Sequence, residues 1–470
     1  MDKPKKTIGV AGGMGPYATA HFFKNILDLT PAKKDWDHVR MVIDNNPHIP
    51  SRSRAILYGE ESPVDGMIDT CARLSAYPVD FIVVPCNSAC YFLPEVQKNI
   101  KTPILNTIEI AADTLVKKIK KGKRVSVLGG SVTYLKETYK DSLERRGYCL
   151  EHHDNATQDK VTELIERVKL GESSSELIEI YREIIKTVKK NDAEGVILAC
   201  TELSVFKDVK IGIPVVDSSH ALAEYAIQVA MGKKEIPLDI DMIHKFWENR
   251  AQMLMNGQVS DYQSTLLTPD VQQAEERDAF EKMTVLKYVK KYSNNKKRAV
   301  DFGCGIGRLT ELLTAHFAYI DACDYCKEFI TKAQERARIK NLKNINYRVS
   351  SVENFKSEQK YDFAFSAGLM IFLNDDQFSK LVSIIAGTIK NGGVCMIRES
   401  MGSTRRFELH HYYSKIIDSI YNAVYRSAEE IVDEFHKHGF VLQEEEITIP
   451  PKPEKPETCQ KILILEKRPK

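Results

Sequence analysis

Two segments of this 470-residue chain are built alike, and each ends in a cysteine. Cys86 follows the apolar run 81–84, and Cys200 follows the apolar run 195–198. Runs of this kind are typical of the buried strands of a parallel sheet. A thiol at the C-terminal end of such a strand, beside the N–H groups of a following helix, has a route to a lowered pKa. Two such thiols facing one pocket would serve as an opposed acid and base.

The segments upstream of the two cysteines repeat as well. An apolar run ending in a pair of glycines opens each stretch, at residues 8–13 and again at 125–130. Similar intervals separate each glycine pair from its cysteine. The pattern predicts two α/β halves of matching layout around a pseudo-twofold site. Buried cysteines are usually inert, but matched placement in two halves favours catalysis.

Three further segments carry a family resemblance. Residues 12–19, 85–89 and 199–203 match, in order, the signatures of the aspartate/glutamate racemase family, which the chain resembles over residues 5–232. The resemblance implies catalysis without a cofactor, in which one cysteine removes the α-proton and the other delivers a proton to the opposite face. Inversion requires groups on both faces of the α-carbon.

The same resemblance implies a set of substrate-binding residues. Arg52 matches the arginine that binds the substrate carboxylate, and Lys169 matches a substrate contact, although a solvated helix end is an equal alternative. The full set is Met14, Gly15, Arg52, Asn87, Ser88, Lys169, Thr201 and Glu202. Cys90 stands where the family commonly has histidine, one helical turn after Cys86, and is interpreted as a small buried residue.

Composition limits the class of protein. The length predicts two or three domains, and 43% hydrophobic and 28% charged residues are typical of a soluble globular protein. A net charge of +2 gives no case for binding nucleic acid or an anionic membrane. No signal peptide or apolar run of transmembrane length is present in the sequence, and ten cysteines indicate the reduced thiols of a cytoplasmic enzyme. One Cys-x-x-Cys pair without a second does not predict a metal site.

Composition also changes along the chain. Residues 233–240 are charged and contain proline, which predicts a linker between a domain at 1–232 and another at 241–470. An amphipathic helix is expected to begin near Asp241. Near the C-terminus, a proline-rich loop separates runs 441–449 and 459–466, which predicts an antiparallel pair of strands.

The second domain has its own candidate site. A short strand leads into a turn containing Gly303, Gly305 and Gly307, where the backbone allows a ligand to approach closely. Asp301, before the turn, would repel a pyrophosphate but suits a cationic ligand. Asp324 follows the next strand, where a ribose-binding carboxylate belongs in such folds. Dinucleotide binding is the alternative.

These residues resemble those of class I S-adenosylmethionine-dependent methyltransferases over roughly residues 241–470. Residues 301–307 match the glycine-rich motif, Asp324 the ribose ligand, and Glu353 lies where the family contacts adenine. The resemblance implies S-adenosyl-L-methionine as the cofactor of this domain. The acidic lining fits a sulfonium cosubstrate.

Residues beyond the fourth and fifth predicted strands are candidates for binding the methyl acceptor. They are Arg398, Arg405, Arg406, Tyr412, Tyr425 and Arg426. An arginine fork suits a carboxylate. The density of aromatic and basic residues predicts a lid over the acceptor pocket, and the alternative for this stretch is a solvent-facing helical hairpin.

The predicted fold class is therefore α/β, with a two-lobed pseudo-symmetric racemase followed by a Rossmann-like methyltransferase. The leading hypothesis is a bifunctional enzyme that racemises an acidic amino acid, aspartate in preference to glutamate, and methylates the D-isomer on its amine. Alternatives are carboxylate O-methylation, racemisation of another α-acidic acid, or one domain serving only as a binding or dimerisation module. The expected partners are a small-molecule amino acid and a second copy of the chain in a homodimer.

Overall fold

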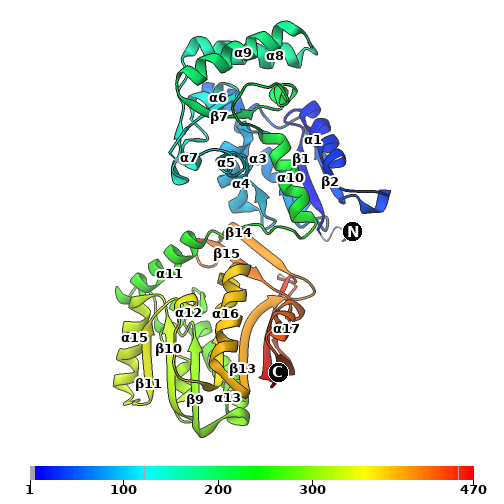
Figure 1. Cartoon of the computed structure of the whole chain (residues 1–470). Helices are drawn as coiled ribbons and strands as arrows, with labels where there is room; N and C mark the ends of the chain where they lie inside the picture. Colours follow the sequence, from blue (N-terminus) through cyan, green and yellow to red (C-terminus); the bar gives the residue numbers. More distant parts are fainter. Residues whose placement is uncertain (1–5, 121, 454, 470) are drawn as a thin grey trace. The chain divides into compact units, whose positions relative to one another are not determined.

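The computed structural model describes residues 6–120, 122–453 and 455–469. The chain divides into two compact units, Met1–Ile236 and Pro237–Lys470 (Figure 1). Residues 235–239, around the point of division, contain no helix or strand. No helix in the described ranges is long and apolar enough to cross a membrane.

The first unit alternates strands with helices. Its strands are β1 (Ile8–Gly12), β2 (Met41–Asn45), β3 (Phe81–Val83), β4 (Ile104–Leu105), β5 (Arg124–Gly129), β6 (Cys149–Leu150), β7 (Ala193–Ala199) and β8 (Val215–Asp217). Its α-helices are α1 (Pro16–Leu29), α2 (Arg52–Tyr58), α3 (Val64–Ser75), α4 (Leu93–Asn99), α5 (Thr107–Val116), α6 (Ser131–Leu135), α7 (Lys140–Arg145), α8 (Asn155–Lys169), α9 (Ser175–Lys190) and α10 (Ser218–Ala230). Short 3-10 helices are η1 (Asp35–Asp37), η2 (Ser88–Tyr91) and η3 (Thr201–Phe206).

The strands of this unit form two parallel sheets of the same topology. One sheet has the order β2–β1–β3–β4 and the other has the order β6–β5–β7–β8. Each strand that precedes a predicted catalytic cysteine, β3 and β7, therefore lies third in its sheet. The two lobes predicted from the repeat are confirmed by this matching order.

The repeat extends to individual hydrogen bonds. Thr107 begins α5, and its hydroxyl donates to the carbonyl of Val84 at 3.4 Å. Ser218 begins α10, and its hydroxyl donates to the carbonyl of Leu198 at 2.8 Å. Each acceptor lies two residues before one of the cysteines. Helices α5 and α10 pack against each other, and α10 also packs against α1, so the lobes share one core (Figure 1).

The second unit contains a larger sheet. Its strands are β9 (Asn294–Phe302), β10 (Phe317–Asp324), β11 (Ile345–Val349), β12 (Tyr361–Ala367), β13 (Ile389–Gly402), β14 (Phe407–Ser414), β15 (Ser419–Tyr425), β16 (Phe440–Ile449) and β17 (Thr458–Lys467). Its α-helices are α11 (Ile240–Met255), α12 (Asp261–Leu266), α13 (Val271–Tyr292), α14 (Thr310–Leu313), α15 (Lys327–Ile339), α16 (Asp375–Thr388) and α17 (Ala428–Lys437), with 3-10 helices η4 (Val352–Asn354) and η5 (Met370–Phe372).

The sheet order is β11–β10–β9–β12–β13–β17–β16, parallel except for β17, which runs antiparallel to β13 and β16. The predicted antiparallel C-terminal pair is thus confirmed. Alternate residues of the central strands enter two separate apolar clusters, one with α13 and the other with α16 and α17. Burial on both faces explains why these strands are nearly continuous apolar runs.

The stretch around β14 and β15 differs from the helical alternative. Residues 407–414 and 419–425 form an antiparallel hairpin of strands, so the helical hairpin is wrong (Figure 1). Aromatic and β-branched residues fit a pleated, half-buried surface better than a helix, and Leu409, Ala423 and Val424 bury themselves here against α11 and η5.

Candidate active sites

The loop after β3 carries the first predicted catalytic residue. Cys86 is partly buried, and the amide of Asn87 next to it is almost fully buried. The Asn87 Nδ2 group donates to Ser218 Oγ at 2.9 Å, and its Oδ1 accepts from Tyr139 Oη at 2.6 Å. Because Ser218 and Tyr139 belong to the second lobe, these bonds join the loop of one cysteine to the lobe that carries the other. The Asn87 side chain is therefore engaged between the lobes.

Cys200 lies at the end of β7, where η3 begins. Its Sγ donates to Glu202 Oε2 at 2.8 Å, and Thr201 Oγ1 donates to the same oxygen at 3.2 Å. Burial, and then the negative charge of Glu202, raise the pKa of Cys200 well above its usual range, while the charge of Lys169 opposes them. The expectation of a lowered pKa is wrong for this thiol, because desolvation and an adjacent carboxylate outweigh the N–H groups of one short turn.

Cys90 lies one turn after Cys86, as its spacing predicts. Its Sγ contacts the carbonyl oxygen of Cys86 at 3.5 Å, and its side chain is buried. Burial, with the nearby charge of Cys86, raises the pKa of Cys90 to about 12. Cys90 is thus held as a thiol packed beneath the loop.

Arg52, the residue predicted to bind the substrate carboxylate, is held by backbone carbonyls. It begins α2, and its Nη1 donates to the carbonyls of Ile49 at 3.3 Å and Pro50 at 3.0 Å. Within the described ranges of the chain, Arg52 has no carboxylate partner, whereas Arg54 is paired with Glu60. Helix α2 packs against η2, which follows Cys86, and against α6 of the second lobe.

The remaining predicted substrate residues lie at the ends of neighbouring elements. Met14 is buried after β1, and Gly15 caps the start of α1. Ser88 begins η2, next to the first cysteine. Lys169 is exposed at the end of α8, and α8 packs against η3 beside the second cysteine.

The glycine-rich turn of the second unit is held by the neighbouring strand. The N–H groups of Gly303 and Cys304 donate to the carbonyl of Cys323 at 2.9 and 3.0 Å. Asp324, at the end of β10, accepts from the N–H of Gly305 at 3.0 Å and from that of Cys326 at 3.0 Å. Burial raises the pKa of Asp324. The turn therefore lies directly beside the carboxylate predicted to bind ribose.

Gly307 shows why this turn requires glycine. Its φ is +76°, and a Cβ built on it would lie 2.4 Å from Tyr347 Oη. Gly303 and Gly305 also have positive φ, at +74° and +54°. The backbone conformation, with a carboxylate at the neighbouring strand end, fits S-adenosylmethionine, which Gly303–Gly307 and Asp324 would hold.

Asp301 lies beneath the turn. It is buried, and its Oδ2 accepts from Thr310 Oγ1 at 2.6 Å. Burial raises the pKa of Asp301 to about 7, with the charge of Asp324 adding to the effect and the Thr310 hydroxyl opposing it. Glu353 lies in η4, where its Oε1 accepts from Gln377 Nε2 at 2.5 Å.

Three of the predicted acceptor arginines have hydrogen-bond and ion-pair partners within the protein. The buried Arg398 pairs with Glu281 and donates to Gln460. Arg406 bonds to Glu408 at 2.5 Å and to Asp375 at 2.7 Å. Arg426 contacts Asp375, donates to the carbonyls of Met370 and Leu373, and lies over the ring of Phe378. Their geometry is that of structural ion pairs.

The other predicted acceptor residues lie on or beside the β14–β15 hairpin. Tyr412 is partly buried on β14, and Tyr425 is buried at the end of β15. Arg405 is exposed just before β14.

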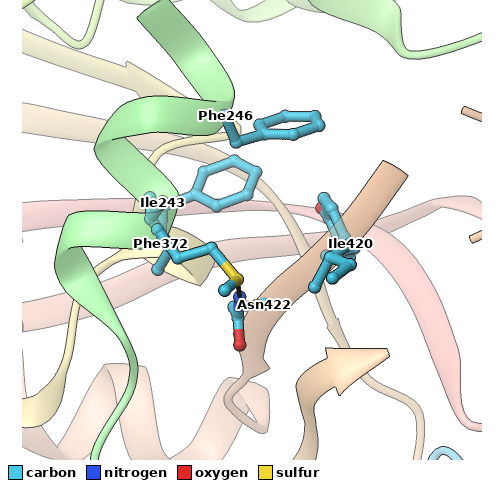
Figure 2. Close-up of a pocket in the computed structure, with 7 residues that line it drawn as sticks. Ile243, Phe246, Phe372, Ile420 and Asn422 are labelled. Carbon is cyan, nitrogen blue, oxygen red and sulfur yellow. Dashed lines mark hydrogen bonds between the residues drawn. The ribbon is translucent and has the colours of Figure 1, made fainter. Parts of the chain in front are cut away.

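A small pocket opens between α11, η5 and β15. Its lining side chains, which pack closely against one another, are Met242, Ile243, Phe246, Phe372, Ile420, Tyr421 and Asn422 (Figure 2). The rings of Phe246, Trp247, Phe372 and Tyr421 form a closed cycle of edge-to-face contacts, with centroids 5.1 to 5.9 Å apart. Trp247 also packs in the apolar cluster of Ile306, inside the glycine turn. Trp247 therefore packs against two rings that line the pocket and also against the apolar cluster that contains Ile306.

Sequence reasoning missed the lobe-bridging Tyr139 and the pocket lining. The repeat offered a signal for Ser218, because Thr107 holds the equivalent position in the first lobe. No comparable signal marks Tyr139, which has no counterpart in a motif. Among the described residues, no group of three or more His, Cys, Asp or Glu side chains is arranged to hold a metal ion.

The matched cysteine strands and the glycine turn beside Asp324 define a two-domain α/β enzyme. A family model described as Asp/Glu/Hydantoin racemase matches residues 12–226, and one described as AdoMet dependent proline di-methyltransferase matches residues 241–450. The chain belongs to the aspartate/glutamate racemase family in its N-terminal half and to the class I S-adenosylmethionine-dependent methyltransferases in its C-terminal half. It is thus an isomerase fused to a methyltransferase.

Each individual relative is either a racemase or a methyltransferase and matches half of the chain or less. The chain is 29% identical to the broad specificity amino-acid racemase RacX of Bacillus subtilis, over 47% of this chain and 96% of that protein. It is 33% identical to the solved Picrophilus torridus aspartate racemase, covering 48% of this chain and 94% of that one, with a TM-score of 0.42. It is 31% identical to phosphoethanolamine N-methyltransferase 1 of Caenorhabditis elegans over 27% of this chain, and spans only about a quarter (26%) of that enzyme.

Proposed function

We propose that the first unit racemises an acidic amino acid, aspartate in preference to glutamate, and that the second methylates the D-isomer on its amine. The observation that carries the proposal is the pair of hydrogen bonds from Asn87 to Ser218 and from Ser218 to Leu198. This chain of contacts ties the residue after Cys86 to the strand that ends before Cys200. It supports one site that receives a cysteine from each lobe.

In this site each cysteine serves one face of the substrate. Cys200 is held as a thiol by burial and by Glu202, so it is the proton donor toward one face of the substrate. Cys86 takes the α-proton from the opposite face, and the carbanion is protonated by Cys200, which inverts the centre. In the reverse direction the roles exchange. Arg52, which has no carboxylate partner in the described parts of the chain, binds a substrate carboxylate.

The amine is proposed as the methyl acceptor because of the relatives. The C-terminal half resembles enzymes whose names specify an N-methyltransferase and a proline di-methyltransferase. S-adenosylmethionine supplies the methyl group when bound. The chain's own residues position the reactants: the glycine turn and Asp324 fix the cosubstrate side, and in-line displacement then depends on the orientation of the nucleophile.

The two activities are tested together in deuterated water with L-aspartate. Without S-adenosylmethionine, the wild type is expected to yield D-aspartate carrying deuterium at the α-carbon. Cys86→Ser and Cys200→Ser should each abolish the formation of D-aspartate, while Cys149→Ser, at an exposed cysteine, should retain it. Racemisation at the wild-type rate in either single variant would overturn the two-base assignment.

With S-adenosylmethionine present, L-aspartate is expected to be consumed well beyond half, because methylation removes the D-isomer from the equilibrium. The Cys86→Ser protein should still methylate supplied D-aspartate. A product whose added mass survives mild base is N-methylated, whereas a methyl ester is hydrolysed and indicates carboxylate O-methylation. If neither aspartate nor glutamate is methylated, the two units do not share a substrate.

A further inference from the structure

We propose that Arg277, on α13, binds a carboxylate of the methyl acceptor, so that the second unit is built for a small anionic amine. The inference rests on the proposed function and specifies the acceptor site of that unit. Arg277 is absent from the acceptor residues predicted by sequence, all of which lie beyond residue 397.

The hydrogen bonds of Arg277 leave part of its guanidinium available. Its Nε contacts Glu281 Oε1 at 3.2 Å, and its Nη1 donates to the carbonyl of Leu266 at 3.0 Å. Its Nη2 has no partner within residues 6–120, 122–453 and 455–469, and about a third of the side chain (36%) is exposed. The guanidinium is thus held in place by two groups while one edge still faces outward, which is the arrangement that a carboxylate-binding arginine needs.

Both hydrogen-bond partners of Arg277, Leu266 and Glu281, lie close to residues of the glycine turn. Leu266 follows Thr265, whose methyl group lies 3.6 Å from a Cβ built on Gly305. Glu281 also binds Arg308, the residue directly after Gly307. Arg277 is therefore fixed relative to the turn where the methyl donor is held, and an acceptor bound by it lies within reach of that turn.

The local balance of charge favours an anion. Arg277, Arg308 and Arg398 share two carboxylates, Asp278 and Glu281. Burial alone would raise the pKa of Glu281, but the charges of Arg398, Arg308 and Arg277 outweigh it and lower the pKa to about 2. Lys282 pairs with Asp278, and the buried Glu399 interacts with Arg398, so four basic side chains face three carboxyl groups and leave a surplus of positive charge. An incoming carboxylate would neutralise that surplus.

Two tyrosines of β15 lie near enough to Arg277 to be affected by its charge. Burial raises the pKa of Tyr421 and of Tyr425, and the positive charge of Arg277 acts on both hydroxyls in the other direction. Tyr421 lines the pocket together with Phe246 and Phe372 (Figure 2). Arg277 suits the carboxylate end of the acceptor, whose amine has to lose its ammonium proton to water before it can accept a methyl group.

The experiment pairs substitutions at Arg277 with changes in the acceptor. Acceptors are D-aspartate, D-asparagine, which has a neutral side chain, and the α-amide of D-aspartate. Losing one charge-assisted hydrogen-bond pair is expected to lower kcat/KM for D-aspartate about 10- to 100-fold in Arg277→Gln. Arg277 is expected to bind one of the two carboxylates of D-aspartate, and each amide lacks a different one. For the amide that lacks the carboxylate bound by Arg277, Arg277→Gln should change kcat/KM little. Arg277→Lys, which keeps the charge but not the fork, should fall between the two.

Two controls separate the possible failures. Arg338→Gln removes an exposed arginine of α15 and should leave all three acceptors unaffected. Calorimetric titration with S-adenosylmethionine should give the wild-type affinity in both Arg277 variants, which shows that the turn is intact. Equal losses with all three acceptors would overturn the role of Arg277 while leaving N-methylation in place. A wild type that binds S-adenosylmethionine but methylates no amino acid would overturn the proposed function and this inference together.

Discussion

Substitution of Glu281 by glutamine should destabilise the second unit in a way that depends on pH. The carboxylate is buried and bonds to Arg277, Arg308 and Arg398. Its pKa falls from the ordinary 4.5 to about 2. A depression of about 2.5 units corresponds to roughly 3 kcal/mol of the free energy of unfolding at neutral pH. Removing one partner of a buried ionic network costs about 3–5 kcal/mol, which agrees with that magnitude.

The direction of the pH dependence follows from the depressed pKa. A carboxylate that is more acidic in the folded state stabilises fully above its unfolded pKa near 4.5, and this contribution is lost as pH falls toward 2. Somewhat less than half of it should be lost by pH 3.5. The gap in stability between the wild type and Glu281→Gln is therefore widest at pH 7 and narrows on acidification.

Tryptophan fluorescence during urea unfolding can report this unit alone. The chain has two tryptophans, the exposed Trp36 in the first unit and Trp247 in the second. In a Trp36→Phe background only Trp247 contributes. Glu335→Gln, at an exposed pair with Lys332, is the matched control and should leave the free energy of unfolding nearly unchanged. A Glu281→Gln protein with the stability and pH dependence of its parent would refute the reasoning.

Two further outcomes test the sites. Gly307→Ala should weaken S-adenosylmethionine binding by about 1–3 kcal/mol in calorimetry. The φ of Gly307 is +76°, and the new methyl group would meet Tyr347. Unchanged affinity would contradict the geometry of the turn. Tyr139→Phe should lower the free energy of unfolding of the first unit by about 1–3 kcal/mol in denaturant titration and slow racemisation, because Asn87 Oδ1 loses its donor; wild-type kinetics would show that the bridge does not support the site.

Local patterns in the sequence were enough for much of the fold. The apolar runs before Cys86 and Cys200, and the glycine turns before them, predicted two lobes because strand burial and glycine conformations are properties of short segments. The turn at Gly303–Gly307 and the strand that ends at Asp324 were likewise readable, since motif and spacing fix a strand, a turn and the edge of a sheet.

Only the tertiary structure decided the environment of individual groups. The spacing at Cys200 predicted a lowered pKa, yet burial and Glu202 raise it, because the protonation of a thiol depends on every charge packed around it. Arg426 had the right residue type for an acceptor site, but all three of its guanidinium nitrogens bond to Asp375 or to the carbonyls of Met370 and Leu373, which are distant in sequence. Nη2 of Arg277, in contrast, has no partner among the residues that the structure describes. A motif specifies which side chains are present, but contacts between distant segments determine which of them remain available to a ligand.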